Sequence, residues 1–472
     1  MPDASPRMEN DGDDMPTIEP SLEQLLVDHI AGTGFDDLDA QAVSCCKKLI
    51  LDALGVTFPG RQAPGCPEIV DLLATWQTAQ GASVFLSGIQ APPPLAAMAN
   101  SAMMHALDFD DTLDASALHT FVNVLPAALA AAETGKKVGG KELITALVVG
   151  VDLICRISLA IDSPLSWIRT ATCGGFGAAA AAAKVLGLDR EQIFNALGVV
   201  YGQTSGNAQG LIEGRLVKRM QPGFAASAGV LSAFLAGRGI TGSRRFLTGA
   251  YGFYPLYEQG VFTPSAVTEG LGAHHSIVDL SIKPYPSCRM THSSIGAALA
   301  LKDRVGPVDA IGQVDVSVSA MVAEMVGKPF EIGDNPQVDA QFSIPYTTAC
   351  ALVRGDVFLQ DFEPRAITDS AVMRLADRVR VVADPTLPSK DILQARMKIT
   401  RGDGTVARER VPVPLGNPQN PMNEDQCRNK FLKCIDFSGI EIQDAARDEL
   451  FSMVDHLESL TDVNDLVRIM AG

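Results

Sequence analysis

The spacing of apolar residues changes near Asp279, and this change divides the chain into two parts. From Ser21 to about Gly272, apolar residues recur every three or four positions, which is typical of amphipathic helices. The periodicity predicts helices at residues 22–30, 40–54, 141–161, 177–188 and 223–237. Alternation of β-branched and polar residues is rare in this half. We therefore predict that it forms an all-helical domain.

Beyond Asp279, strand patterns stand between helical ones. Residues 313–319 alternate strictly between apolar and polar, as a half-buried strand does. Residues 395–400 and 405–410 flank the sequence Arg-Gly-Asp-Gly, which predicts a β-hairpin. Residues 344–353 and 370–379 have helical patterns. The predicted fold is mainly α with an α+β lid, that is, a large all-helical domain plus a smaller α+β domain.

These patterns also set the expected domain boundaries. Residues 1–20 are acidic and poor in apolar residues, so we expect a disordered tail. Residues 21–278 form the helical domain, and residues 279–412 form the α+β lid of ordinary domain size. A proline-rich linker or extended crossing spans 411–422. The helical pattern then returns, and residues 413–472 are expected to complete the helical domain.

Composition narrows the functional class. The 472 residues carry a net charge of -17, which argues against a nucleic acid or an anionic membrane as partner. The N-terminus resembles neither a signal peptide nor a transit peptide, and no uninterrupted apolar run reaches membrane-spanning length. The nine cysteines contain no CxxC pair, so we expect reduced thiols. We therefore expect a soluble, cytoplasmic protein.

The segment 101–127 holds the most concentrated polar chemistry. It places Asp108, Asp110, Asp111 and Asp114 near two histidines, His105 and His119, between apolar helical stretches. Such groups are costly to desolvate, which favours acid–base chemistry or cation binding. The alternative is a solvated loop in which the aspartates cap helices.

Three further segments carry candidate binding groups. Lys218 and Arg219 precede a helix of small residues, which suits a carboxylate, although two surface cations would give the same pattern. Residues 283–292 gather Lys, Tyr, Arg289 and His292 before an alanine-rich helix, which favours an anion site over a structural histidine. Tyr346 begins an apolar helix, and taken alone it fits a core aromatic with a bonded hydroxyl better than a site residue.

Familiar cofactor motifs do not explain these segments. Residues 175–180 fit GxGxxA, but no buried strand precedes them, so helix packing explains the glycines better. The Asp-rich segment lacks the central glycine and final glutamate of an EF-hand loop. HExxH, P-loop and GxSxG motifs are absent from the sequence, and the cysteines do not cluster as an iron–sulfur centre requires. We expect no metal and no other cofactor.

Taken in order, the blocks HALDFDD, KRMQPGFAASAGVLSAFLA, KPYPSCRMTHSSIGAAL, FSIPYTTACALVRGD and PLGNPQNPMNEDQCRNKF resemble the MmgE/PrpD family, from about Ser21 to Leu466. The resemblance implies a helical domain with an α+β lid, a homodimer and a small carboxylate substrate. It maps the active site onto six positions: Asp108, Thr112, His119, Lys218, His292 and Tyr346.

The implied chemistry moves a proton or CO2 beside a carboxylate, which builds enolate-like charge. Lys218, Arg219 and Arg289 are the expected carboxylate ligands, with Thr112 also at the substrate. His119 and His292 are the expected proton carriers. Asp108 would orient a histidine or act as a base, and Tyr346 would donate to the developing charge.

Three positions depart from the family pattern. Ile168 stands where lyases of this type carry a histidine, and isoleucine cannot transfer a proton. Its neighbour Arg169 can hold a carboxylate but stays protonated at neutral pH. Gln221 replaces another common histidine, and His119 is followed by Thr120 instead of proline.

The predicted function is a cofactor-independent lyase, a dehydratase or decarboxylase, acting on a small di- or tricarboxylate. An isomerase or epimerase of a related polycarboxylate is the first alternative, because protonation can return to another face or carbon. A non-catalytic family member is the second. Loss of one proton carrier harms dehydration most, since hydroxide must leave with the help of an acid.

Overall fold

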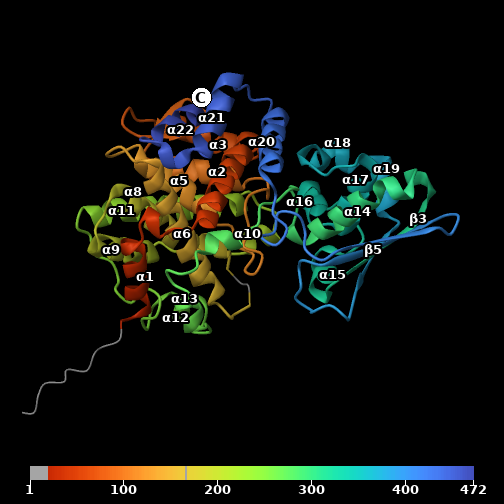
Figure 1. Cartoon of the computed structure of the whole chain (residues 1–472), viewed down its shortest axis with the longest axis horizontal. Coiled ribbons are helices and arrows are strands. Elements are labelled where there is room, and N and C mark those ends of the chain that lie inside the picture. The colour runs from red at the N-terminus through yellow and green to blue at the C-terminus, as the bar shows by residue number, and fades with distance from the viewer. Residues whose placement is uncertain (1–19, 165–166) are drawn as a thin grey trace, which may run out of the picture.

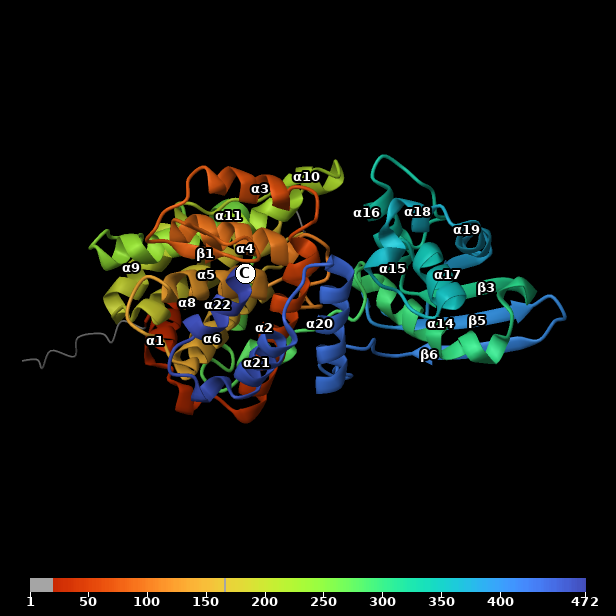
Figure 2. The ribbon, with the colours of Figure 1, turned by 90° about the horizontal axis from the view of Figure 1, so that it is seen from above.

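The computed structural model describes residues 20–164 and 167–472, and in it the chain forms two lobes (Figures 1 and 2). The predicted disordered tail, apart from Pro20, lies outside the described residues. The larger lobe is helical and the smaller one combines helices with a sheet, which confirms the predicted fold class. Among the described residues, no helix is both long and apolar enough to cross a membrane. All nine cysteines are free thiols.

Close contacts between small residues hold the helical lobe together. Its main helices are α1 (Leu22–Gly32), α2 (Ala40–Gly60), α3 (Cys66–Ala74), α4 (Pro93–His105), α5 (Phe121–Ala132), α6 (Gly140–Leu159), α8 (Gly174–Leu186), α9 (Arg190–Tyr201) and α11 (Val217–Gly237). The alanine-rich α8 lies at the centre. A Cβ atom on Gly177 would lie 2.3 Å from Ile154 of α6, so this glycine permits the close helix crossing. The GxGxxA segment is therefore part of a packed helix, as the sequence indicated.

The all-helical prediction is wrong at one place in this lobe. A short antiparallel hairpin joins β1 (Ala82–Val84) to β2 (Ile89–Ala91). Asn100 of α4 holds it by accepting from the amide of Phe85 and donating to the carbonyl of Ser83, at 2.9 Å each. Strands of three residues are too short to show a clear alternation in sequence.

The start of α11 also differs from the prediction. The helix begins at Val217 rather than Gly223, so Lys218 and Arg219 lie in its first turn. Gly223 lies inside the helix, where a Cβ atom would come within 2.6 Å of the carbonyl oxygen of Met98 in α4. That glycine serves the close approach of two helices, not the start of one.

The smaller lobe is built on a four-stranded sheet in the order β4-β3-β5-β6. Its strands are β3 (Ile311–Val318), β4 (Val379–Ala383), β5 (Ala395–Arg401) and β6 (Val406–Val411). β5 and β6 pair antiparallel, which confirms the predicted hairpin, whereas β3 and β4 are parallel. The helix predicted at 370–379 is wrong at its end: α19 (Ser370–Ala376) stops early, and the β-branched run from Val379 forms β4.

The C-terminal helices α20 (Glu424–Ser438), α21 (Asp444–Asp455) and α22 (Asn464–Ala471) return to the larger lobe. Phe431 of α20 packs edge-on against Phe58 of α2. Each lobe has its own hydrophobic core, and the residues of α20–α22 belong to the core of the helical lobe. We propose the domain boundaries at residues 279 and 412 on this basis, with α14 (His292–Val305), α16 (Pro336–Gln341) and α17 (Ile344–Arg354) in the lid.

Candidate active site

The loop between α4 and α5 is fixed by side chains that reach it from distant parts of the chain. Three of its carbonyl groups accept such bonds: Leu107 from Gln341, Asp108 from Lys283 and Phe109 from Lys430. A fourth carbonyl, that of Asp111, accepts from His119 within the same loop. Asp108 has a φ of 53°, a left-handed conformation that costs a non-glycine residue about 1 kcal/mol or more. The surrounding bonds therefore hold the loop in a strained shape at the boundary between the two lobes.

Asp108 and Lys218 form an ion pair at this boundary. The Nζ atom of Lys218 lies 2.6 Å from Oδ1 of Asp108, and the two side chains are 20% and 16% exposed. Burial alone would raise the pKa of the Asp108 carboxyl, but the ammonium groups of Lys218 and Lys283 outweigh it and hold that pKa well below its usual range. The carboxylate is therefore charged at neutral pH.

A small pocket opens beside this pair. Both lobes line it: the helical lobe contributes Asp108, Arg215, Lys218 and Arg219, and the lid contributes Asn335 and Gln341. Its volume of about 40 Å³ has room for water molecules but not for a tricarboxylate. Substrate binding at this position therefore requires these side chains or the lid to move.

Two imidazoles meet on one carboxylate next to the loop. Nδ1 of His105 lies 2.8 Å and Nδ1 of His119 lies 3.0 Å from Oδ2 of Asp110. Burial, helped by the positive charge of Lys218, lowers the pKa of His105 from its ordinary value of 6.5 to about 4. Burial alone would raise the pKa of Asp110, but the two imidazoles outweigh it and that pKa falls well below its usual range.

These three residues also have donor atoms suited to a metal ion, all within 4.8 Å of one another. Two features oppose that use. Both Nδ1 atoms already face the carboxylate oxygen at hydrogen-bond distance. The ammonium group of Lys218 is also close enough to lower the pKa of His105. The arrangement fits two imidazoles held in one tautomer better than it fits a ligated cation.

Asp111 has a structural role. Its carboxylate accepts from the backbone amides of Thr120 and Phe121, at 2.9 and 3.1 Å, where α5 begins. Burial and the neighbouring charge of Asp110 raise the pKa of Asp111. Asp111 therefore caps the start of α5, as the alternative interpretation of the segment predicted.

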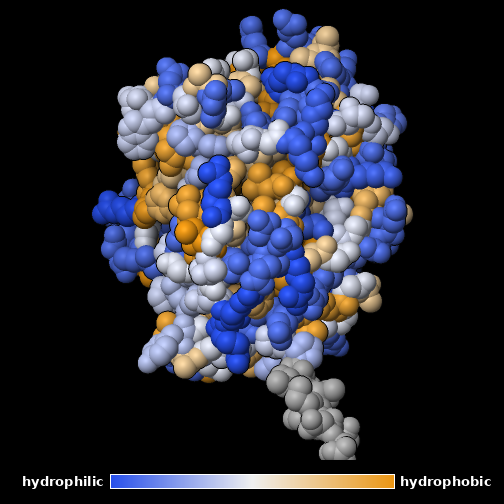
Figure 3. All heavy atoms as spheres, turned by 90° about the vertical axis from the view of Figure 1, so that its left-hand side faces the viewer, coloured by the Kyte–Doolittle hydropathy of each residue, from blue (hydrophilic) through white to orange (hydrophobic). Residues whose placement is uncertain are grey.

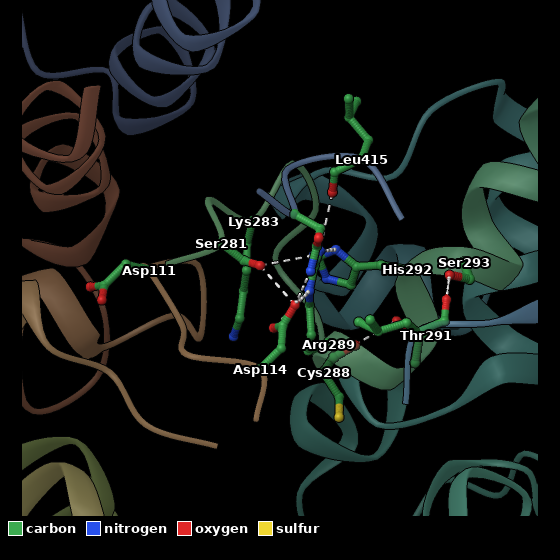
Figure 4. Close-up of polar contacts among 12 residues, drawn as sticks. Asp111, Asp114, Ser281, Lys283, Cys288, Arg289, Thr291, His292, Ser293 and Leu415 are labelled. Carbon is green, nitrogen blue, oxygen red and sulfur yellow. Dashed lines mark hydrogen bonds and ion pairs between the residues drawn. The ribbon is translucent and has the colours of Figure 1, made fainter. Parts of the chain in front are cut away.

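Arg289 and His292 belong to a second network, shown in Figure 4. The Nε atom of Arg289 lies 3.0 and 3.1 Å from the two carboxylate oxygens of Asp114. Arg289 also donates to Nδ1 of His292, the carbonyl of Leu415 and the hydroxyl of Ser281. Most of its N–H groups are therefore used within the protein. Arg289 crosslinks loops and has few donors left for a substrate carboxylate.

His292 is likewise held at both ring nitrogens. Its Nε2 lies 3.2 Å from the carbonyl of Ser287, while Nδ1 faces Arg289. Burial, then the charges of Arg289 and Lys283, lower its pKa well below the ordinary value. In this arrangement His292 is a neutral, buried side chain and lacks a free nitrogen for proton transfer.

The remaining predicted residues are dispersed. Tyr346 is fully buried in the lid core, and its hydroxyl donates to the carbonyl of Asp361, so the core-aromatic alternative describes its position. Thr112 is buried and exchanges two backbone hydrogen bonds with Ser281. Arg169 donates to the carbonyl of Ser163. Arg219 donates to the carbonyl of Pro64 but still lines the pocket.

Two of the three altered family positions, Ile168 and Gln221, lie beside Gly206. A Cβ atom on Gly206, whose φ is 137°, would lie 3.3 Å from Oε1 of Gln221 and 3.4 Å from the carbonyl of Ile168. Gln221 also accepts from the amide of Asn207 and donates to its carbonyl. Next to Ile168, the hydroxyl of Thr170 accepts from the amide of His119 at 3.1 Å. Ile168 therefore lies close in the chain to a residue that touches the histidine loop.

Sequence reasoning did not assign a role to Lys283, Asp110 or His105. All three lie in blocks that carried the family resemblance, which was the available signal. No local sequence pattern marks Arg215, Asn335 and Gln341 as site residues. They line the pocket only because the two lobes lie against each other in the folded chain.

Two family models match consecutive parts of the chain. Residues 24–264 match the model of the MmgE/PrpD N-terminal domain, and residues 285–455 match that of the MmgE/PrpD C-terminal domain. A cis-aconitate decarboxylase-like protein of Aspergillus oryzae is 29% identical, over 92% of this chain and 94% of its own. A cis-aconitate decarboxylase of Mus musculus is 26% identical over 96% and 94%. A 2-methylcitrate dehydratase of Cupriavidus necator is 25% identical over 86% and 88%.

Proposed function

The chain belongs to the MmgE/PrpD family, and we propose that it is a cofactor-independent lyase that removes CO2 or water from a small di- or tricarboxylate. Relatives named as decarboxylases and dehydratases match nearly the whole chain, which supports the reaction class. The observation that carries the proposal is the Lys218–Asp108 ion pair at a pocket between the lobes, next to the paired imidazoles of His105 and His119.

Substrate binding begins with an exchange of anions. Three cations, Arg215, Lys218 and Arg219, line the pocket in a chain whose net charge is -17. When the site is closed, the carboxylate of Asp108 forms an ion pair with the ammonium group of Lys218. An incoming carboxylate takes that place, and the two arginines neutralise a second one.

Proton transfer falls to His119. Its Nδ1 faces Asp110 and the carbonyl of Asp111, whereas its Nε2 has no hydrogen-bond partner among the described residues. The side chain is 16% exposed, and because His119 does not line the closed pocket, a bound molecule meets it only when the site opens. The carbonyl of Asp111 and the carboxylate of Asp110 together fix the tautomer, and the charge of Asp110 offsets the charge that the ring carries during proton transfer.

Among lyase reactions, decarboxylation suits this site best. The C–C bond to the departing CO2 breaks, its electron pair stays on the substrate carbon, and His119, which enters the step as the imidazolium with a proton taken from solvent on Nε2, gives that proton to the carbon and returns to the neutral Nδ1–H form. Dehydration needs a base for the C–H bond and an acid for the leaving hydroxide. Ile168 cannot serve as the second group, and His292 has both nitrogens engaged.

We further propose a homodimer, in line with the family resemblance. Val217, Phe224 and Leu231 follow one another at seven-residue spacing along α11 and are 44%, 43% and 40% exposed. Figure 3 looks at the side of α9 and α11 and shows apolar residues near the middle of this face. A stripe of this kind is typical of a surface covered by a partner. Sedimentation of the Phe224→Glu variant beside the parent protein tests it.

The function is tested by NMR of the chelator-treated protein in deuterated water. Cis-aconitate, 2-methylcitrate, citrate and iminodisuccinate are supplied in turn. We expect loss of CO2 from a tricarboxylate with one deuteron incorporated per turnover. Solvent exchange without loss of CO2 or water would support the isomerase alternative, and activity that returns only with a divalent metal would exclude the cofactor-free mechanism.

A further inference from the structure

The outer face of the lid sheet carries an unusual concentration of cations. The inner face packs on the helices through Val314, Val316 and Ile399, which are fully buried. The opposite face is a shallow hollow of about 760 Å³. Five cations line it: Arg380 on β4, Arg396 and Lys398 on β5, and Arg408 and Arg410 on β6. This charge stands out on a chain whose net charge is -17.

The strand register places like charges opposite each other. Lys398 pairs with Arg408 and Arg396 pairs with Arg410 across the β5–β6 ladder. Like charges at directly opposite positions destabilise a sheet. These pairs therefore lower the stability of the lid as long as no anionic partner is bound to it. Three acidic groups lie on or beside this face: Asp315 lies 3.5 Å from Lys398, Asp384 lies 2.6 Å from Arg396, and Glu409 lines the hollow but pairs with Arg304. Arg380, Arg408 and Arg410 have no ion-pair partner in the described ranges 20–164 and 167–472.

We propose that this face binds an extended acidic segment of another protein. Side chains on one face of a strand repeat every two residues, at roughly 6.6 Å, and acidic side chains at alternate positions of an extended peptide have the same spacing. Arginine clusters recognise such motifs through bidentate bonds to carboxylates. The face lacks aromatic residues for stacking nucleic-acid bases, which disfavours a single-stranded nucleic acid. It also lies outside the pocket that contains Lys218.

The experiment measures fluorescence anisotropy of a labelled peptide of alternating Glu and Ser, at low salt, with the full chain. The variant R408Q/R410Q should weaken binding by about fivefold or more, the size expected for two lost ion pairs. The matched control is R244Q/R468Q, which removes the same charge from exposed, ion-paired cations of the helical lobe. The control should bind like the parent, and the lyase activity of both variants should be unchanged.

Three results would overturn the proposal. The first is absence of peptide binding at low salt. The second is an equal weakening of peptide binding in both double variants, which would show that only the net charge of the chain matters. The third is tighter binding of single-stranded RNA or of anionic lipid vesicles than of the peptide, each measured by competition. Far-ultraviolet circular dichroism of each variant verifies that the sheet is retained.

Discussion

His105 and His119 turn their Nδ1 atoms toward the same oxygen atom of Asp110, and Nδ1 of His119 also donates to the carbonyl of Asp111. Their Nδ1 atoms lie 2.8 and 3.0 Å from Oδ2 of Asp110, and their rings meet edge to face with centroids 4.9 Å apart. Since a carboxylate only accepts, both rings must carry the proton on Nδ1 when they are neutral. This leaves Nε2 of His119 as the nitrogen that transfers the proton in the proposed mechanism.

The first prediction concerns Asp110. Asp110→Asn should lower kcat about 10²-fold or more, with a smaller effect on KM, because a neutral amide no longer offsets the charge that His119 carries during proton transfer and no longer holds His105 in the Nδ1–H tautomer. Nitrogen NMR of the imidazoles should show the change of tautomer. Asp111→Asn is the matched control: it should cost about 1 kcal/mol of stability through the weakened helix cap. An unchanged tautomer in Asp110→Asn would contradict this role.

Much of the fold was accessible from the sequence, because helices such as α2 and α6 carry a strong apolar periodicity. The site was less accessible. The contact between Asp108 and Lys218 joins residues 110 positions apart, and no local pattern reports such a distance. Residue type alone also cannot show that the donors of Arg289 are taken by Asp114, or that Tyr346 lies in the lid core. The family resemblance indicated segments that meet at the boundary between the lobes, whereas packing decides which of their side chains stay available.

The second prediction separates the two histidines expected to carry protons. His119→Gln should lower kcat by about 10²-fold, the usual effect of removing a general acid or base. His292→Asn should mainly lower stability, by about 1–3 kcal/mol, because its buried hydrogen bonds are lost. Steady-state kinetics and urea unfolding of both variants distinguish these effects. A larger loss of kcat in His292→Asn than in His119→Gln would reverse the assignment.

The third prediction concerns the tie between Asp114 and Arg289. Asp114→Ala leaves a buried guanidinium without its carboxylate and should lower the free energy of unfolding by about 3 kcal/mol or more. Asp465→Ala removes a partner of Arg468 on the surface and should cost less than about 1 kcal/mol. Urea titration measures both. If both variants lost the same small free energy of unfolding, the ion pair of Asp114 with Arg289 would not stabilise the fold.

The fourth prediction concerns pH. The pKa of His105 falls from 6.5 in its ordinary state to about 4 in the folded protein. Between these values the unfolded chain binds the additional proton, so the free energy of unfolding decreases as pH falls. The group should contribute a loss of about 2 kcal/mol between about pH 7 and pH 5.

His105→Asn should flatten this part of the stability profile. Asp52, whose pKa is raised to about 6 mainly by burial, acts in the opposite direction over part of the window. The comparison of parent and variant at each pH removes that contribution. A profile with the same slope in both proteins would show that His105 takes up its proton equally in the folded and unfolded states.

The last prediction concerns Ile168, where the family histidine is absent. If a histidine at this place supplies the second proton group, the protein should dehydrate 2-methylcitrate slowly, and Ile168→His should raise that rate. Decarboxylation should change less, since one proton from His119 suffices. Arg169→Ala tests the neighbour separately and should raise KM if its guanidinium holds a substrate carboxylate. Fast native dehydration that neither substitution alters would show that the chemistry of this protein diverged elsewhere, and the hydrogen-bonded pair of Gln221 and Asn207 beside Gly206 would be the next position to change.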